Sequence, residues 1–237
     1  QSLIPASSMK VITTGSAIAL LGKNFRFETY LEYSGRILDS VLIGDIFIRG
    51  TGDPSLASPL MKGVKNRVAL QKEFVVAIQQ LGIQKINGQI IGDASYFDDQ
   101  TLIETWQWGD IGNHYGAGSG GLNYHDNLYY IHFEKSSDYG SKPLVKYTVP
   151  ELPNFDIDSR VSSAGSRSGD NAYVYAAPFS QRATIRGTIP KGSGLFNIKG
   201  ALTDPALICA YDLTNALFEV GITCLLYTSP SPRDQAK

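Results

Sequence analysis

The stretch Pro5-Ala6-Ser7-Ser8-Met9-Lys10 decides how the beginning of this chain folds. Proline fixes its own backbone φ angle and is favoured in the first turn of a helix, so Pro5 marks a helix start. Residues 11–21 continue as a largely apolar run of helical character, and Gly22 is a typical residue after a last turn. We therefore predict a helix that begins near Pro5 and ends at residue 21.

Ser7 and Lys10 are the chemically notable residues of this helix. Because they are three positions apart, their side chains lie on one face, one turn from each other. The helix dipole and desolvation both disfavour an ammonium ion, so the Lys10 amine can take the Ser7 proton and activate the hydroxyl. The plain alternative is a capping serine beside a solvated lysine, since one Ser-x-x-Lys arises by chance in a chain of this length. We favour the nucleophile, because this is the only Ser-x-x-Lys and its helix is too apolar for a surface position, which predicts a core helix.

Composition excludes several functions. The 237 residues carry a formal net charge of −1, so neither nucleic acid nor a charged membrane surface is an expected partner. No apolar run approaches the length of a membrane span. The histidines His114, His125 and His132 lack the spacing of metal ligands, and no dinucleotide fingerprint occurs, so we expect no metal and no cofactor. Cys209 and Cys224 fit an oxidising or a reducing compartment equally well.

The remainder of the chain predicts an α+β fold with a β-rich second part. Two further helices are expected over residues 68–81 and 204–220, the second opened by Asp204 and Pro205. The later strands are short and separated by loops rich in Gly, Ser and Pro. The expected strands are 25–33, 41–49, 86–92, 128–133, 145–149, 174–176, 183–187 and 194–199.

An aromatic loop with regularly spaced glycines is the second candidate site. It reads Trp106-Gln107-Trp108-Gly109-Asp110, followed by Tyr115-Gly116-Ala117, and it holds both tryptophans of the chain beside a carboxylate. This composition is typical of a ligand platform and equally of the edge of a core. The residues alone leave both possibilities open.

Residues 225–237 break the pattern of everything before them. They read Leu-Leu-Tyr-Thr-Ser-Pro-Ser-Pro-Arg-Asp-Gln-Ala-Lys and show no packing logic. The segment resembles translated sequencing-adapter read-through. We therefore expect a non-native tail, with the protein proper ending near Thr223.

Four blocks of sequence, taken in order, resemble one known family. They are residues 3–14 with 21–22 and 25–29, residues 44–56, residues 88–93 with 97–98, and residues 106–110 with 115–117. Together they look like the D-alanyl-D-alanine carboxypeptidase/endopeptidase family, the class C low-molecular-mass penicillin-binding proteins of peptidase family S13. The likeness runs in register from Leu3 to about Thr223.

The resemblance implies a serine-type hydrolase of peptidoglycan stem peptides. Ser7 would be the acyl-enzyme nucleophile and Lys10 its base, with the Ser7 backbone N–H contributing to an oxyanion hole. β-Lactams, whose strained amide mimics the scissile bond, would acylate Ser7. Asp110, with Trp106 or Trp108, would hold the free end of a diaminopimelate side chain. The location implied is periplasmic or otherwise extracytoplasmic.

The chain departs from the family in two motifs. Family enzymes also use Ser-x-Asn and Lys-Thr-Gly, but Ser168-Gly169-Asp170-Asn171 has the wrong spacing and Lys191-Gly192-Ser193 the wrong residues. In the family both motifs follow a long insertion that splits the transpeptidase domain. We therefore expect residues 1–35 to begin a split serine transpeptidase/β-lactamase-like domain and residues 36–224 to form a β-rich inserted region. We also expect this chain by itself to be inactive.

Two other interpretations stay open. A non-catalytic cell-envelope module, whose β-rich part binds glycan or a partner protein, would use the loop of residues 106–110 equally well. Another serine acyl-transfer enzyme, such as a β-lactamase, has the same Ser-x-x-Lys tetrad. It lacks the long insertion before the next motif, so it agrees less well with this chain.

Overall fold

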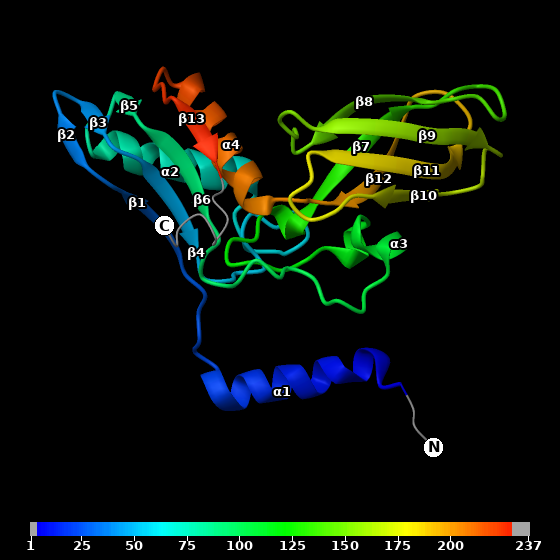
Figure 1. The fold of residues 1–237 in the computed structure, drawn as a ribbon, viewed down its shortest axis with the longest axis horizontal. Coiled ribbons are helices and arrows are strands. Elements are labelled where there is room, and N and C mark those ends of the chain that lie inside the picture. Colours follow the sequence, from blue (N-terminus) through cyan, green and yellow to red (C-terminus); the bar gives the residue numbers. More distant parts are fainter. Residues whose placement is uncertain (1–3, 229–237) are drawn as a thin grey trace.

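The computed structural model describes residues 4–228 and shows two lobes side by side, with one helix outside both (Figure 1). The first lobe combines helices with a mixed sheet, and the second is a β-sandwich. The chain builds most of the first lobe, then the sandwich, and returns to the first lobe for its last helix and strand. This mixture of helices and strands confirms the α+β class.

The helical elements of the described residues are η1 (Ala6–Ser8), α1 (Met9–Leu21), α2 (Arg67–Gln80), α3 (Trp108–Ile111), η2 (His114–Gly116), η3 (His125–Asn127) and α4 (Pro205–Glu219). The three predicted helices correspond to η1 with α1, to α2 and to α4, and their ends lie close to the predicted residues. The short elements α3, η2 and η3 were not predicted. The predicted cap of α4 is confirmed, because the Asp204 carboxylate accepts a 2.9 Å hydrogen bond from the Leu207 N–H. Gly82 follows α2 with φ of +74°, a conformation that glycine adopts without strain.

Within residues 4–228, the strands form four small sheets. They are β1 (Thr29–Tyr33), β2 (Arg36–Leu38), β3 (Val41–Ile43), β4 (Ile46–Gly50), β5 (Lys85–Asn87), β6 (Gln89–Asp93), β7 (Leu128–Glu134), β8 (Leu144–Val149), β9 (Asp156–Ala164), β10 (Asn171–Tyr175), β11 (Arg182–Pro190), β12 (Leu195–Ala201) and β13 (Leu226–Thr228). The first lobe contains the sheets β1-β4-β6-β13 and β2-β3-β5, and the sandwich contains β12-β7-β8 and β10-β11-β9.

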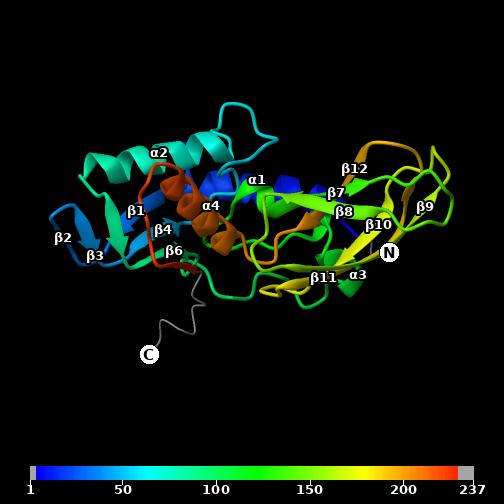
Figure 2. The same cartoon turned by 90° about the horizontal axis from the view of Figure 1, so that it is seen from above.

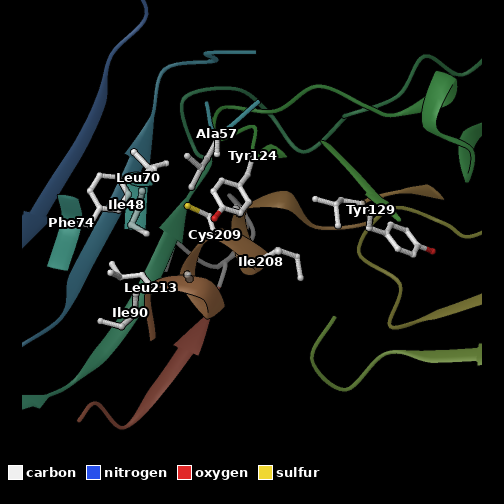
Figure 3. Close-up of a cluster of buried hydrophobic side chains, with 14 of the residues drawn as sticks. Ile48, Ala57, Leu70, Phe74, Ile90, Tyr124, Tyr129, Ile208, Cys209 and Leu213 are labelled. Carbon is white, nitrogen blue, oxygen red and sulfur yellow. The ribbon is translucent and has the colours of Figure 1, made fainter. Parts of the chain in front are cut away.

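The core of the first lobe lies between its larger sheet and helices α2 and α4 (Figure 2). Strands β4, β6 and β13 run parallel, and β1 pairs antiparallel at the edge. Alternate residues of β4, Ile46 and Ile48, are buried, as expected for a strand with one covered face. They belong to the same apolar cluster as Phe74 of α2 and Leu213 of α4 (Figure 3).

The sandwich buries the inward faces of its two sheets, for example Ile131 and Ile198 on one and Val174 and Ile185 on the other. Its strand β9 was not predicted. Most residues of β9 are Asp, Ser or Arg, and the strand has no continuous apolar run. It forms because it pairs in parallel with β11 over its whole length.

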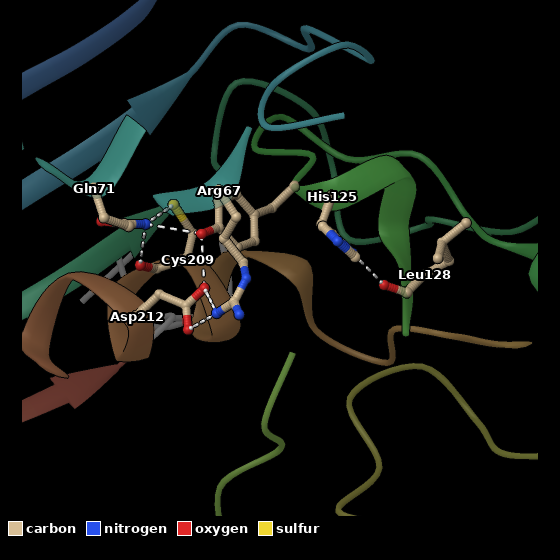
Figure 4. Close-up of polar contacts among 7 residues, drawn as sticks. Arg67, Gln71, His125, Leu128, Cys209 and Asp212 are labelled. Carbon is tan, nitrogen blue, oxygen red and sulfur yellow. Dashed lines mark hydrogen bonds and ion pairs between the residues drawn. The ribbon is translucent and has the colours of Figure 1, made fainter. Parts of the chain in front are cut away.

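A buried polar network joins α2 to α4 (Figure 4). Nη1 of Arg67 lies 2.8 Å from both carboxylate oxygens of Asp212, and the Tyr124 hydroxyl donates to Asp212 at 2.7 Å. Gln71 donates to the Tyr124 hydroxyl at 2.9 Å and, at 3.4 Å, to the carbonyl of Cys209. Partial burial lowers the pKa of Arg67, but the hydrogen bond and charge of Asp212 outweigh this, so the pKa is raised.

The prediction that the first helix is a core helix is wrong for this structure. Every residue of α1 is exposed, including Ile12 at 61% and Leu20 at 84%, and the helix stands away from both lobes (Figure 1). A helix this apolar needs a partner to cover it, and residues 4–228 do not supply one. Within the same residues, none of the helices has the combination of length and hydrophobicity that crossing a bilayer requires.

The expected boundaries at residues 35 and 225 can be compared with the strand pairing of the first lobe. Strand β1 lies before residue 35 but pairs with β4 from Thr29↔Gly50 to Tyr33↔Ile46, so it is built into the first lobe. Residues 226–228 do have a place in the fold, because β13 pairs with β6 and the Tyr227 ring lies 5.1 Å from that of Tyr211. This corrects the expectation of no packing at the start of the tail; residues 229–237 lie outside the described part of the chain.

Candidate functional site

Ser7 and Lys10 occupy the predicted positions at the start of the first helix. Ser7 lies in η1, which is one turn of 3₁₀ helix, and Lys10 lies in the first turn of α1, which follows η1 directly. The neighbouring Ser8 hydroxyl donates a hydrogen bond to the carbonyl of Pro5. The Ser7 hydroxyl does not take part in this hydrogen bond. Among the described residues, no hydrogen bond joins Ser7 to Lys10, and both side chains face solvent.

The aromatic loop forms a second cluster, on the short helix α3 and the turn η2. The half-buried Asp110 accepts a 3.4 Å hydrogen bond from the Tyr115 hydroxyl. Burial first, and then the charge of Asp110, raise the pKa of Tyr115. Trp106 and Trp108 are 41% and 56% exposed, so they are available to a ligand rather than buried as core side chains.

Two residues hold this loop on the sandwich. The buried Asn113 side chain donates to the Gly109 carbonyl at 2.7 Å and accepts from the Val174 N–H at 3.0 Å, joining the loop to β10. The Gly112 carbonyl accepts from the Ala201 N–H of β12 at 2.9 Å. A Cβ at Gly112 would lie 2.2 Å from the Val174 carbonyl oxygen, so only glycine permits this approach. The backbone that carries Trp108 and Asp110 is thereby anchored to both sheets of the sandwich.

The two sets of predicted site residues lie in separate parts of the structure. Trp106, Trp108 and Asp110 lie in one loop beside the sandwich, whereas Ser7 lies in η1 and Lys10 in α1, which stands apart from both lobes (Figure 1). The sequence analysis missed Asn113, because nothing in its neighbourhood distinguishes it from an ordinary loop asparagine. Within residues 4–228, no group of three or more His, Cys, Asp or Glu side chains is placed to hold a metal ion.

Comparison with known proteins places the chain in a family. Residues 1–226 match the model of the D-Ala-D-Ala carboxypeptidase 3 (S13) family. The chain is 24% identical over 221 residues to the D-alanyl-D-alanine carboxypeptidase DacB of Haemophilus influenzae, covering 93% of this chain and 44% of that protein. It is 21% identical over 234 residues to the D-alanyl-D-alanine carboxypeptidase of Actinomadura sp. (strain R39), covering 94% of this chain and 40% of that protein.

Solved structures share the fold. The crystal structure of penicillin-binding protein 4 (dacB) from Haemophilus influenzae superposes with a TM-score of 0.74 at 24% identity, covering 96% of this chain and 48% of that one. The same protein complexed with a novel β-lactam gives a TM-score of 0.65 at 21% identity, covering 97% of this chain and 46% of that one. The chain thus spans less than half the length of these relatives. Because the family model matches nearly its whole length, the chain belongs to the D-Ala-D-Ala carboxypeptidase 3 (S13) family.

Proposed function

We propose that this chain carries the nucleophile of a serine-type D-Ala-D-Ala carboxypeptidase/endopeptidase that acts on peptidoglycan stem peptides. The observation that supports this most is the Ser7-Ser8-Met9-Lys10 tetrad at a helix start, in a chain that matches the S13 family over residues 1–226. The name of both curated relatives is D-alanyl-D-alanine carboxypeptidase.

In the proposed reaction, the amine of Lys10 takes the proton of the Ser7 hydroxyl as Oγ attacks the carbonyl carbon of the D-Ala-D-Ala bond. The Ser7 backbone N–H, at the positive end of α1, helps to stabilise the oxyanion. Collapse of the tetrahedral intermediate breaks the C–N bond as the Lys10 ammonium returns its proton to the departing nitrogen, so D-alanine leaves and an ester remains on Ser7. Water then hydrolyses this ester and restores the Ser7 hydroxyl. Attack on a cross-link at the same position is the endopeptidase reaction. A β-lactam acylates Ser7 in the same way.

We assign Asp110, with Trp106 and Trp108, to the free end of a diaminopimelate side chain. A carboxylate suits the ammonium group of this side chain, and exposed indole faces suit its aliphatic part and its charge. Among residues 4–228, Asp110 forms no ion pair with a lysine or arginine, so its charge is available to a ligand. The anchoring of the loop by Asn113 supports this role, since a preorganised site loses less entropy on binding.

We further propose that the 237-residue chain alone is not acylated, because it contains neither Ser-x-Asn nor Lys-Thr-Gly and leaves Ser7 exposed. The test is incubation with a fluorescent penicillin, followed by gel analysis. The chain alone should stay unlabelled. A longer protein that contains this chain together with both motifs should be labelled stoichiometrically, and its Ser7→Ala variant should not.

Two outcomes would overturn these proposals separately. Stoichiometric labelling of the chain alone at Ser7 would refute its inactivity. Labelling that persists in the Ser7→Ala variant of the longer protein would refute the nucleophile itself. A non-catalytic cell-envelope module remains the second candidate, supported by the exposed aromatic loop, and an extracytoplasmic location is common to both.

A further inference from the structure

A row of exposed aromatic rings continues from the Asp110 loop along strand β10. Tyr173 and Tyr175 are two positions apart in the strand, so their side chains point to the same face of the sheet. Val174 between them is fully buried and points into the sandwich. Tyr173 is 49% exposed although it lies in the middle of a strand, so this outer face is open to solvent.

Helix α3 and turn η2 add two rings to this face. The Trp108 ring lies 6.5 Å from the Tyr175 ring, at an interplanar angle of 38°. Tyr115 is 56% exposed on η2, and its hydroxyl donates to Asp110 of α3 at 3.4 Å, so this ring lies next to the helix that carries Trp108. Helix α3 contacts β10 directly (Figure 1). We call Trp108, Tyr115, Tyr173 and Tyr175 the aromatic platform.

Hydrogen-bonding groups border the aromatic platform. Arg186 and Thr184 of β11 lie directly opposite Tyr173 and Tyr175 in the antiparallel ladder, so they share the outer face. Arg186 is exposed and forms no ion pair within the described residues. A guanidinium with five donors, a threonine hydroxyl and the tyrosine hydroxyls therefore surround flat apolar rings.

This combination matches the chemistry of a pyranose sugar, which has one face of C–H groups and a rim of hydroxyl and acetamido groups. Four aromatic rings grouped on one part of a protein surface indicate a binding site. The platform is also continuous with Asp110, which under the proposed function holds the stem peptide. Because a stem peptide is covalently attached to a glycan of amino sugars, the sugars that carry it lie within one stem-peptide length of this loop.

We propose that the aromatic platform binds the glycan strand of peptidoglycan by stacking its N-acetylated amino sugars on Tyr173 and Tyr175, with Trp108 at the junction with the peptide subsite. This inference rests on the proposed function for the identity of the ligand. It adds a sugar subsite on β10 to the peptide subsite at Asp110. A surface that instead docks a protein would give no response to a free oligosaccharide.

The test uses chitotetraose, a β-1,4-linked tetramer of N-acetylglucosamine that carries no peptide. It is titrated into the 237-residue chain, and binding is followed by NMR chemical shifts and calorimetry. We expect saturable binding, at least tenfold weaker in Tyr175→Ala and in Tyr173→Ala. Tyr175→Phe keeps the ring and should stay within threefold of the unchanged chain. The matched control is Tyr139→Ala, a 77% exposed tyrosine outside the platform, which should bind equally well.

Absence of saturable binding, or equal affinity in Tyr175→Ala and the unchanged chain, would overturn the proposal, provided that circular dichroism shows the variants to be folded. The variant Asp110→Asn distinguishes the proposed sugar subsite from the peptide subsite. Chitotetraose affinity should change less than twofold in Asp110→Asn, and an equal loss there would also overturn a distinct sugar subsite. Penicillin labelling of Ser7 depends on none of the platform tyrosines, so its failure would count against the proposed function alone.

Discussion

Tyr124 and Tyr129 are both fully buried, but their hydroxyl groups have opposite surroundings. The Tyr124 hydroxyl donates to Asp212 and accepts from Gln71. The Tyr129 hydroxyl has no hydrogen-bond partner among the described residues, and its ring is packed so tightly that a Cβ at Gly200 would lie 2.6 Å from it. A buried hydroxyl without a partner carries a desolvation cost that phenylalanine does not have.

We therefore expect Tyr129→Phe to raise the free energy of unfolding by about 1 kcal/mol, because it removes an unsatisfied group and keeps the ring. The matched variant Tyr124→Phe should lower it by about 1–2 kcal/mol, since it takes a partner from Asp212 and Gln71. Urea unfolding of both variants measures the difference. A destabilised Tyr129→Phe would show that the hydroxyl is satisfied in solution, for example by a bound water.

His125 should make the stability depend on pH. Burial lowers its pKa below the ordinary value of 6.5, and the ring donates to the Leu128 carbonyl at 3.0 Å. The unfolded chain therefore binds a proton at a higher pH than the folded chain does, so the free energy of unfolding falls as the pH drops below about 6.5. Each unit by which the pKa is lowered corresponds to about 1.4 kcal/mol.

Unfolding midpoints of the unchanged chain and of His125→Gln, measured from pH 7.5 to 5.5, test this expectation. The variant should lose less stability over that range. Parallel curves for the unchanged chain and His125→Gln would contradict a neutral, buried His125.

At the scale of elements, the ion pair between Arg67 of α2 and Asp212 of α4 links the two helices. The Asp212 side chain is only 6% exposed, so removal of its partner leaves a buried charge. Arg67→Met should lower the free energy of unfolding by about 2–3 kcal/mol, less than for a fully buried pair because Arg67 is partly exposed. Replacing both residues, Arg67→Met with Asp212→Leu, should recover much of the loss.

The exposed pair of Lys65 and Glu73 is the control for that measurement, with side chains 58% and 52% exposed. Glu73→Gln should change the free energy of unfolding by less than about 0.5 kcal/mol, because exposed ion pairs contribute little. An equal effect of Arg67→Met and Glu73→Gln would show that the buried network does not hold the two helices together.

The loop that carries α3 depends on one side chain. Asn113→Ala removes the acceptor for the Val174 N–H and the donor to the Gly109 carbonyl, so it should lower the free energy of unfolding by about 2 kcal/mol. The fluorescence of Trp106 and Trp108 should shift in the same variant, because the loop is released from the sandwich. Asn197→Ala, at an exposed position of β12, should do neither. A stable Asn113→Ala with unchanged fluorescence would mean that Gly112 alone anchors the loop.

At the scale of the whole molecule, α1 is the part with the least tertiary support. None of its residues is buried, so local opening there costs little free energy. Limited digestion with trypsin should therefore cut first at Lys10, Lys23 and Arg26 and leave a resistant product that begins after α1. Mass spectrometry of the earliest fragments identifies the sites. First cuts within the sandwich would contradict the view of α1 as an exposed appendage.

The sequence by itself determined the local structure. Pro5 and Gly22 bracket the first helix, Asp204 and Pro205 open α4, and the tetrad places Ser7 and Lys10 one turn apart. Such features depend on neighbours within one helical turn, whose backbone preferences and caps are encoded in a few consecutive residues. The roles of Ser7, Lys10 and Asp110 stay predictions, because local spacing does not show what approaches a side chain.

Only the tertiary structure decided burial and long-range pairing. The apolar character of α1 predicted a core position, but burial also requires a partner surface, and residues 4–228 contain none that covers it. Strand β9 has a polar sequence and exists because β11 pairs with it. Asn113 meets Val174 across 61 positions of the chain. Contacts of this kind follow from how separate elements are packed together, and no local pattern in the sequence encodes them.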